Sequence, residues 1–161
     1  MSTRRQAREA VLKALYLSEC RNMNIDKAFD EMASFDTEID ALGDSDEAEE
    51  LKPFALGIDE QQKMFAIDLS HRIVDSSDEL DDHIKPALVN WEFSRIARID
   101  RHILWIAIAE MEFFLDIPVT VSIDEAIELA KKYSSEKSPS FINGVLDKVA
   151  RDIGALKKDD E

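Results

Sequence analysis

The stretch DRHILWIAIAEMEFFL, residues 100–115, predicts a helix that is apolar on most of its sides. A helix with apolar side chains on most of its sides is surrounded by other elements. We therefore expect a central helix that begins at Asp100 as its N-cap and runs to about Leu115. Its continuous apolar run, ILWIAIA at residues 103–109, is far too short to cross a bilayer.

The flanking segments also show helical periodicity, with apolar residues three and four positions apart. Helices are expected over residues 3–21, 25–34 and 58–75, and over three later segments that start near 76, 122 and 138. Glycine and proline are scarce at four each, which favours helices over a sandwich rich in turns. The helices are expected to begin at side chains that accept a hydrogen bond from the first turn: Thr3 (with Gln6), Ser76, Asp100, Ser122 and Ser138.

The sequence therefore predicts an all-α fold in a single domain, residues 1–154, followed by a charged tail at 155–161. The segment VTV at 119–121 is too short to be a meaningful strand. Gly154 is expected to end the last helix. Gly144 lies inside that helix at a cost of about 1 kcal/mol, and we expect another helix to approach closely there.

Charge is distributed unevenly along a chain whose formal net charge is −15. Residues 1–21 have a net charge of +3, residues 22–130 have −19, and residues 131–161 have +1. An acidic protein repels polyanions at long range. Because screening at physiological salt limits that repulsion to about 8 Å, a local basic surface is still able to bind one.

The segment DTEIDALGDSDEAEE, residues 36–50, has eight acidic residues and no basic one. An EF-hand needs oxygen ligands at alternating positions and glycine at the sixth. Counted from Asp44, Ala48 is fifth and Glu49 is sixth, so calcium is disfavoured. We interpret residues 36–60 as an acidic insertion on the surface, in a loop or frayed helix.

Signals for enzyme chemistry are weak. The four glycines are scattered, so there is no phosphate-binding loop. His71 and Asp75 are one helical turn apart, but further metal ligands have no obvious source. Cys20 is the only cysteine and is expected to be a small buried side chain in a reducing cytoplasm. We expect no catalytic site, no metal and no cofactor.

The first helix has a basic cluster, Arg4, Arg5 and Arg8, on one flank of its apolar stripe. Tyr16 is within about 20° of Arg5 on the helical wheel. Guanidinium groups bind phosphate with paired donors, and an aromatic ring stacks on an unpaired base. The cluster suits single-stranded RNA, and pairing with the protein's own acidic body is an equal alternative. Arginines at a helix N-terminus oppose the macrodipole, which slightly favours a specific role.

A second basic group comes just before the last helix. Lys131, Lys132 and Lys137 precede Ser138, whose helix start would offer N–H groups to a phosphate. An ordinary cap with solvated lysines is the simpler interpretation.

Three segments together resemble the NusB family of transcription antitermination factors. They are RRQAREAVLKALY at residues 4–16, WEFSRIARIDRHILWIAIAEM at 91–111, and the stretch from Ile117 to Lys148 that contains EAIELAKKYSSEKSPSFINGVLDK. The resemblance implies about seven helices in two packed subbundles. The acidic 36–60 segment departs from it, being longer and more acidic than is usual in the family.

The resemblance also implies a function. It implies binding to boxA RNA together with NusE, the small-subunit ribosomal protein that doubles as an elongation factor, at the elongating RNA polymerase. Premature termination, chiefly in ribosomal RNA operons, is thereby suppressed. By motif match, the RNA-binding residues would be Arg4, Arg5, Arg8, Tyr16, Lys131, Lys132, Lys137, Ser138 and Phe141.

The basic protein partner is expected on the acidic middle of the chain, at Asp78, Asp81, Asp82 and Glu92. No membrane partner is expected, and whether the free protein forms a homodimer is left open. Two other functions remain as alternatives. One is the RNA-binding part of an RNA cytosine methyltransferase, which requires the chain to be a fragment. The other is a protein-interaction bundle without RNA affinity.

Overall fold

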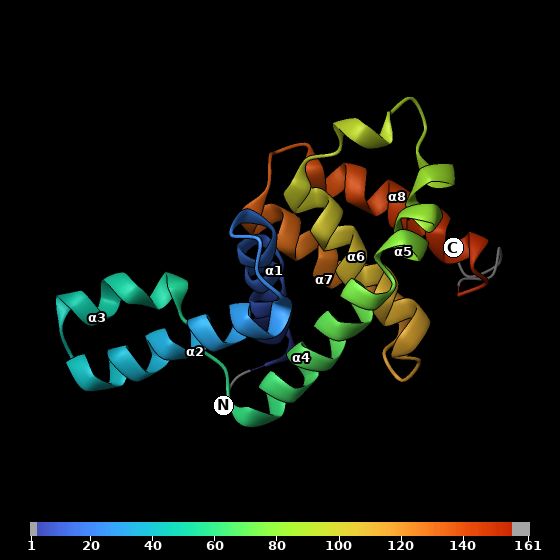
Figure 1. Ribbon diagram of the computed structural model, residues 1–161. Coiled ribbons are helices and arrows are strands. Elements are labelled where there is room, and N and C mark those ends of the chain that lie inside the picture. Colours follow the sequence, from blue (N-terminus) through green and yellow to red (C-terminus); the bar gives the residue numbers. More distant parts are fainter. Residues whose placement is uncertain (1–2, 156–161) are drawn as a thin grey trace. The chain divides into compact units, whose positions relative to one another are not determined.

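The computed structural model describes residues 3–155 and is drawn in Figure 1. These residues form eight α-helices and three short 3-10 helices, and they include no strand. The all-α prediction is confirmed, with eight α-helices in place of about seven. Most of the predicted charged tail, residues 156–161, lies outside the described residues. The chain divides into two units, Met1–His71 and Arg72–Glu161.

The first unit is built on α1 (Arg4–Cys20), which begins with the predicted capping box. The Thr3 hydroxyl accepts from the Gln6 N–H, and the Gln6 side chain accepts from the Thr3 N–H. The predicted apolar stripe is buried, and α1 packs on α2 (Ile25–Leu42). The sequence therefore predicted the start and the inner face of this helix correctly.

The helix α2 is longer than predicted, because it continues to Leu42 where a loop or frayed helix was expected. Charged side chains on a solvent face do not interrupt a helix, and the inner face of its second half is covered. Phe35 packs on Phe54 with ring centroids 5.8 Å apart. The short helices α3 (Asp46–Leu51) and η1 (Lys52–Phe54) run back beside α2 (Figure 1). The acidic insertion is thus mostly helical.

The helix α4 (Glu60–Asp75) begins two residues later than predicted. The Asp59 carboxylate accepts the Gln62 N–H at 3.0 Å and holds its first turn. Within the first unit, His71 Nε2 lies 2.6 Å from the Asp26 carboxylate on α2. This exposed pair joins α4 to α2.

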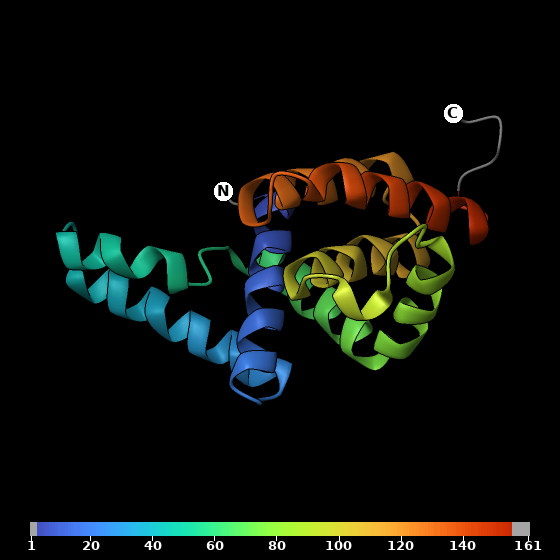
Figure 2. The ribbon, with the colours of Figure 1, turned by 90° about the horizontal axis from the view of Figure 1, so that it is seen from above.

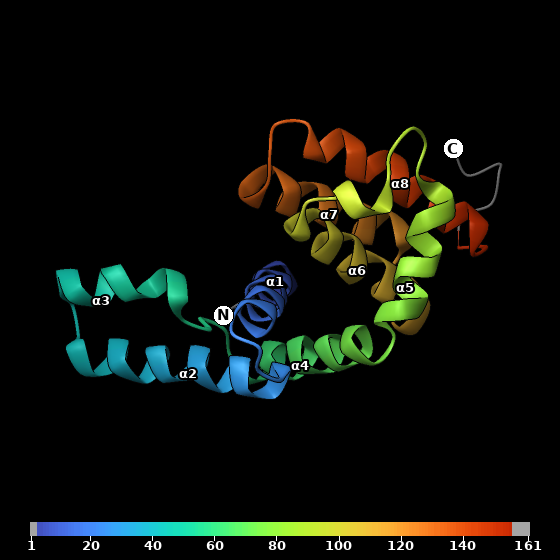
Figure 3. The same ribbon diagram turned by 45° about the horizontal axis from the view of Figure 1, so that its top comes forward.

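The second unit surrounds the predicted central helix, α6 (Arg98–Phe113). It contacts α5 (Ser77–Ile84), α7 (Val119–Tyr133) and α8 (Ser138–Asp152), as Figure 3 shows. Every residue from His102 to Met111 is buried. Helices α7 and α8 run side by side (Figure 2). Two 3-10 helices, η2 (Lys85–Ala87) and η3 (Phe93–Arg95), lie between α5 and α6.

Ser76 is the N-cap of α5 as predicted, but its side chain forms no capping bond. The other three predicted N-caps are wrong, because α6, α7 and α8 are preceded by Ala97, Pro118 and Lys137. Asp100, Ser122 and Ser138 instead use their oxygens in bonds to other helices. The segment 119–121 is the first turn of α7. The period of a helix does not show which side chains of other helices a polar residue contacts. Asp100, Ser122 and Ser138 lie inside α6, α7 and α8, and their sequence pattern alone resembles that of a cap.

Of the two predictions for glycines in and just after α8, one is confirmed and one is wrong. Gly154 has a φ of +78°, and the Ala155 N–H donates to the Ala150 carbonyl at 2.8 Å, so the predicted helix end is confirmed. At Gly144, a Cβ would meet nothing within 4 Å, so the expected close approach of another helix is wrong. No helix among residues 3–155 is long and apolar enough to span a bilayer.

Candidate nucleic-acid interface

The outer face of α1 presents part of the predicted basic cluster. Arg4 and Arg5 are exposed in the first turn. The Arg4 guanidinium carbon lies 4.6 Å from the centre of the Phe65 ring on α4, a cation–π contact that orients it. Tyr16, three turns further on, is 50 % exposed. A guanidinium pair at one end of α1 and an aromatic ring near the other are suited to a phosphate and a base.

Arg8 differs from its neighbours because it is only 4 % exposed. Its guanidinium carbon is 5.9 Å from the same Phe65 ring. A wheel drawn for α1 alone does not show this, because α4 supplies the ring. Arg8 therefore fixes α1 from within the protein and presents little surface to a ligand.

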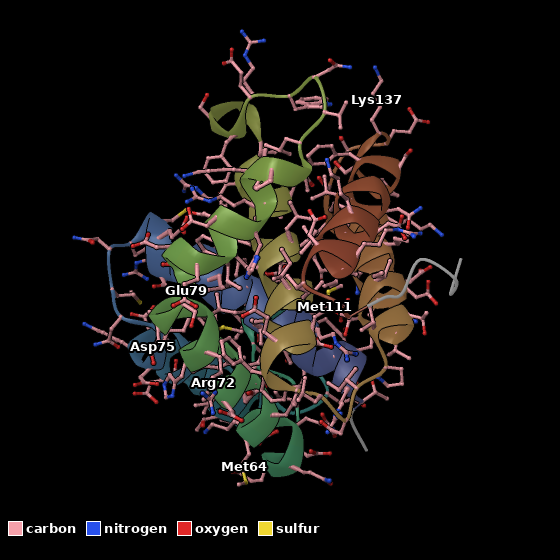
Figure 4. The ribbon with its side chains drawn as sticks, turned by 90° about the vertical axis from the view of Figure 1, so that its right-hand side faces the viewer. Met64, Arg72, Asp75, Glu79, Met111 and Lys137 are labelled. Carbon is pink, nitrogen blue, oxygen red and sulfur yellow. The ribbon has the colours of Figure 1, made fainter. Side chains whose placement is uncertain are left out.

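The second basic group lies at the facing ends of α7 and α8. Lys131 Nζ is 3.3 Å from Glu128, and Lys132 Nζ is 5.3 Å from the Tyr133 ring centre. Lys137, the N-cap of α8, is exposed and points outward from the start of that helix (Figure 4). The loop between the two helices thus presents positive charge to solvent.

A buried carboxylate holds this loop in place. Asp100, on the first turn of α6, is 7 % exposed and accepts from Ser134 Oγ at 2.6 Å and from Ser138 Oγ at 2.9 Å. Ser138 itself is 3 % exposed and also contacts Ser135 Oγ. One carboxylate therefore ties the start of α6 to the end of α7 and the start of α8. Ser138 has a structural role here, since its hydroxyl is used inside the protein.

The helix start at Ser138 offers fewer backbone donors than were predicted. The Ser138 N–H donates to the Ser135 carbonyl and the Phe141 N–H to the Lys137 carbonyl. Pro139 has no N–H to donate. Three of the first four residues of α8 therefore have no N–H available for a phosphate.

Phe141 is half-buried and packs against an aromatic residue that was not among the predicted site residues. Its ring centroid is 5.3 Å from that of Trp91, which is 55 % exposed. Trp91 belongs to one of the motifs that resemble the family, but it follows a loop without helical periodicity. An exposed tryptophan next to a predicted RNA-binding residue is the signal that was missed.

The predicted partner-binding acids separate into two kinds. Asp78, Asp82 and Glu92 are exposed. Asp81 is 7 % exposed and accepts from Arg101 Nη2 at 2.6 Å and from Trp105 Nε1 at 2.8 Å. Its carboxylate joins α5 to α6 inside the second unit and is not a surface charge.

The three histidines and Cys20 are the remaining candidates of the sequence. Among residues 3–155, no three His, Cys, Asp or Glu side chains come close enough to hold a metal ion. His71 pairs with Asp26, His83 pairs with Glu112, and His102 is fully buried beside the Trp105 ring. Cys20 is exposed, so the expectation of a buried cysteine is wrong. It is the last residue of α1, beyond the part of the stripe that is buried.

Comparison with known proteins finds relatives of one family that match nearly the whole chain. A model described as the NusB family matches residues 5–151. The transcription antitermination protein NusB of Geotalea daltonii is 35 % identical over 153 residues, which is 95 % of this chain and 97 % of the relative. The protein of the same name from Bacillus subtilis is 35 % identical, over 93 % of this chain and 96 % of the relative. This chain covers 66 % of the length of a longer relative, the protein of the same name from Chloroherpeton thalassium.

Solved structures agree with the fold. NusB of T. maritima superposes with a TM-score of 0.72 at 32 % identity, covering 93 % of this chain and 92 % of that one. A structure of antitermination factors NusB and NusE in complex with double-stranded RNA superposes with a TM-score of 0.69. It covers 92 % of this chain and 96 % of that one, and at 22 % identity it supports the fold alone.

Proposed function

This chain belongs to the NusB family, and from that premise we propose that it binds boxA single-stranded RNA jointly with NusE at the elongating RNA polymerase. In this role it suppresses premature termination, chiefly in ribosomal RNA operons. The observation that carries the proposal is the match of residues 5–151 to the family, which includes the arginine helix and the loop before α8. The names of the relatives favour antitermination over RNA methylation.

The first unit contributes the RNA surface of α1. Arg5 and Tyr16 are exposed and are proposed to contact RNA directly, with Arg4 held in place over the Phe65 ring. Arg8 is buried, so its proposed role is to position α1. Paired guanidinium donors and an aromatic ring match a phosphate and an unpaired base.

The second unit contributes a separate basic surface. Lys131, Lys132 and Lys137 are exposed around the loop between α7 and α8, and Phe141 is half-buried one turn into α8. We assign the RNA contacts to these residues, and to Ser138 the positioning of the loop through Asp100.

The protein partner is proposed to bind the exposed acids of the second unit. Asp78, Asp82 and Glu92 present negative charge, which complements a basic ribosomal protein. Asp81 supports that surface from inside. The role is one of binding without catalysis, and it places the protein in the cytoplasm, where bacterial transcription occurs.

Fluorescence anisotropy of a labelled boxA RNA, compared with a scrambled RNA, tests the proposal. The intact chain should prefer boxA, bind it more tightly when NusE is added, and lose affinity in Arg5→Ala. Val74→Ala, at a 47 % exposed apolar residue of the second unit, is the matched control and should bind as the unchanged protein does. Equal affinity for the two RNAs, with and without NusE, would refute the proposal.

A further inference from the structure

The connection between α5 and α6 presents an aromatic ring to solvent. Trp91 is 55 % exposed, although tryptophan is highly buried on average. Its neighbour Asn90 has a φ of +63°, in the left-handed region that asparagine tolerates better than most residues. The sharp turn at Asn90 and the packing on Phe141, 5.3 Å away, together hold the indole in a defined place.

A hollow of about 540 Å³ lies at this turn and is lined by Asn90, Trp91, Glu92 and Arg95. Glu92 Oε2 is 3.7 Å from Arg95 Nε, and the two side chains are 74 % and 75 % exposed. An ion pair so exposed is weak, and both groups therefore remain accessible to a ligand. The hollow thus combines a flat ring, an amide, a carboxylate and a guanidinium.

We propose that Trp91 and this hollow bind one unpaired nucleobase of a single-stranded RNA, an assignment that rests on the proposed function. Unpaired bases stack on aromatic rings and form hydrogen bonds through their edges. The Trp91 ring provides the stacking surface, while the Asn90 amide provides a donor and an acceptor for the edge of the base. Arg95 provides charge for the adjoining phosphate.

The position of the hollow supports RNA as its ligand. Phe141, which packs on Trp91, follows Lys137 by four residues and so lies one helical turn along the same face. Phe141 thus links Trp91 to the turn of α8 that follows Lys137.

Two substitutions at Trp91 test the ring in the full-length chain. Trp91→Leu removes the aromatic ring, and Trp91→Phe keeps one. Since stacking contributes about 1–3 kcal/mol per base, Trp91→Leu should weaken binding of labelled boxA RNA about tenfold, and Trp91→Phe much less. Val89→Ala, at a 64 % exposed residue two positions away, is the matched control and should change affinity little.

Tryptophan fluorescence gives a second readout. Trp105 is 6 % exposed and donates to Asp81, so quenching of emission by RNA should come from Trp91 and disappear in Trp91→Phe. If the unchanged protein binds boxA RNA but Trp91→Leu binds it equally well, the base site is wrong and the proposed function stands. If Trp91→Leu weakens only the affinity for NusE, the hollow belongs to the protein interface. If the unchanged protein binds no RNA, both proposals fail.

Discussion

Substitution of Asp81 tests whether its carboxylate stabilises the fold or serves as a surface charge for a partner. Its carboxylate accepts from Arg101 Nη2 at 2.6 Å, from Arg101 Nε at 3.3 Å and from Trp105 Nε1 at 2.8 Å. Asp81→Ala removes these bonds and leaves the indole N–H of Trp105, a residue only 6 % exposed, without its acceptor.

The magnitude follows from the burial of each donor. A buried donor left without an acceptor costs about 1–3 kcal/mol. The Arg101 side chain is 37 % exposed, so water replaces part of its lost bond, and the charge pair adds only about 1 kcal/mol. We expect the free energy of unfolding to fall by about 2–4 kcal/mol in Asp81→Ala. Asp81→Asn keeps an acceptor for Trp105 and should cost about half as much.

Urea unfolding followed by tryptophan emission measures this loss, because both tryptophans belong to the second unit. Asp82→Ala is the matched control. The Asp82 side chain is 75 % exposed and lies 3.9 Å from Lys85, so its loss should change the free energy of unfolding by less than about 0.5 kcal/mol. Equal stabilities of Asp81→Ala and Asp82→Ala would refute a structural role for Asp81.

Three further predictions concern α8 and its loop. Gly144→Ala should raise the free energy of unfolding by about 0.5–1 kcal/mol, because the added Cβ would meet nothing within 4 Å. A lower free energy of unfolding in the same urea assay would contradict this. Asp100→Ala should lower it by about 2 kcal/mol, since two hydroxyls, of Ser134 and Ser138, lose their acceptor, and an unchanged midpoint would argue against the carboxylate as the anchor of the loop. Lys137→Ala should weaken boxA binding and reduce the log–log salt slope by about 0.7, the value for one phosphate on a single strand; an identical slope would mean that Lys137 contacts no phosphate.

Local periodicity predicted the parts of the fold that depend on a single helix. The capping box of Thr3 and Gln6 and the buried face of α1 follow from spacing within one turn or a few turns. The burial of α6 follows from an apolar surface too wide to face water. These features needed no knowledge of what packs against the helix.

Features that depend on a partner helix were not predictable in this way. Ser138 has the sequence pattern of a cap, but its hydroxyl bonds to Asp100, 38 residues away. Asp81 is one of several acids in its segment, and only the positions of Arg101 and Trp105 distinguish it from the exposed Asp82.

The candidate site shows the same division. Arg4 and Arg8 are one turn apart on α1, yet Arg4 is exposed and Arg8 is buried. Trp91 was missed because an exposed aromatic residue in an irregular loop has no periodic signal, and only its exposure and its contact with Phe141 reveal it. The family motif therefore predicts which segments take part in binding, whereas the side chain that makes each contact depends on packing.

Readthrough of a terminator in reconstituted transcription tests whether this protein acts as an antitermination factor. Two templates are compared, one with boxA upstream of the terminator and one with the boxA sequence scrambled, each with and without this protein in the presence of NusE. We expect the protein to increase full-length transcript on the boxA template alone. Equal readthrough with and without the protein, or an equal increase on both templates, would contradict it.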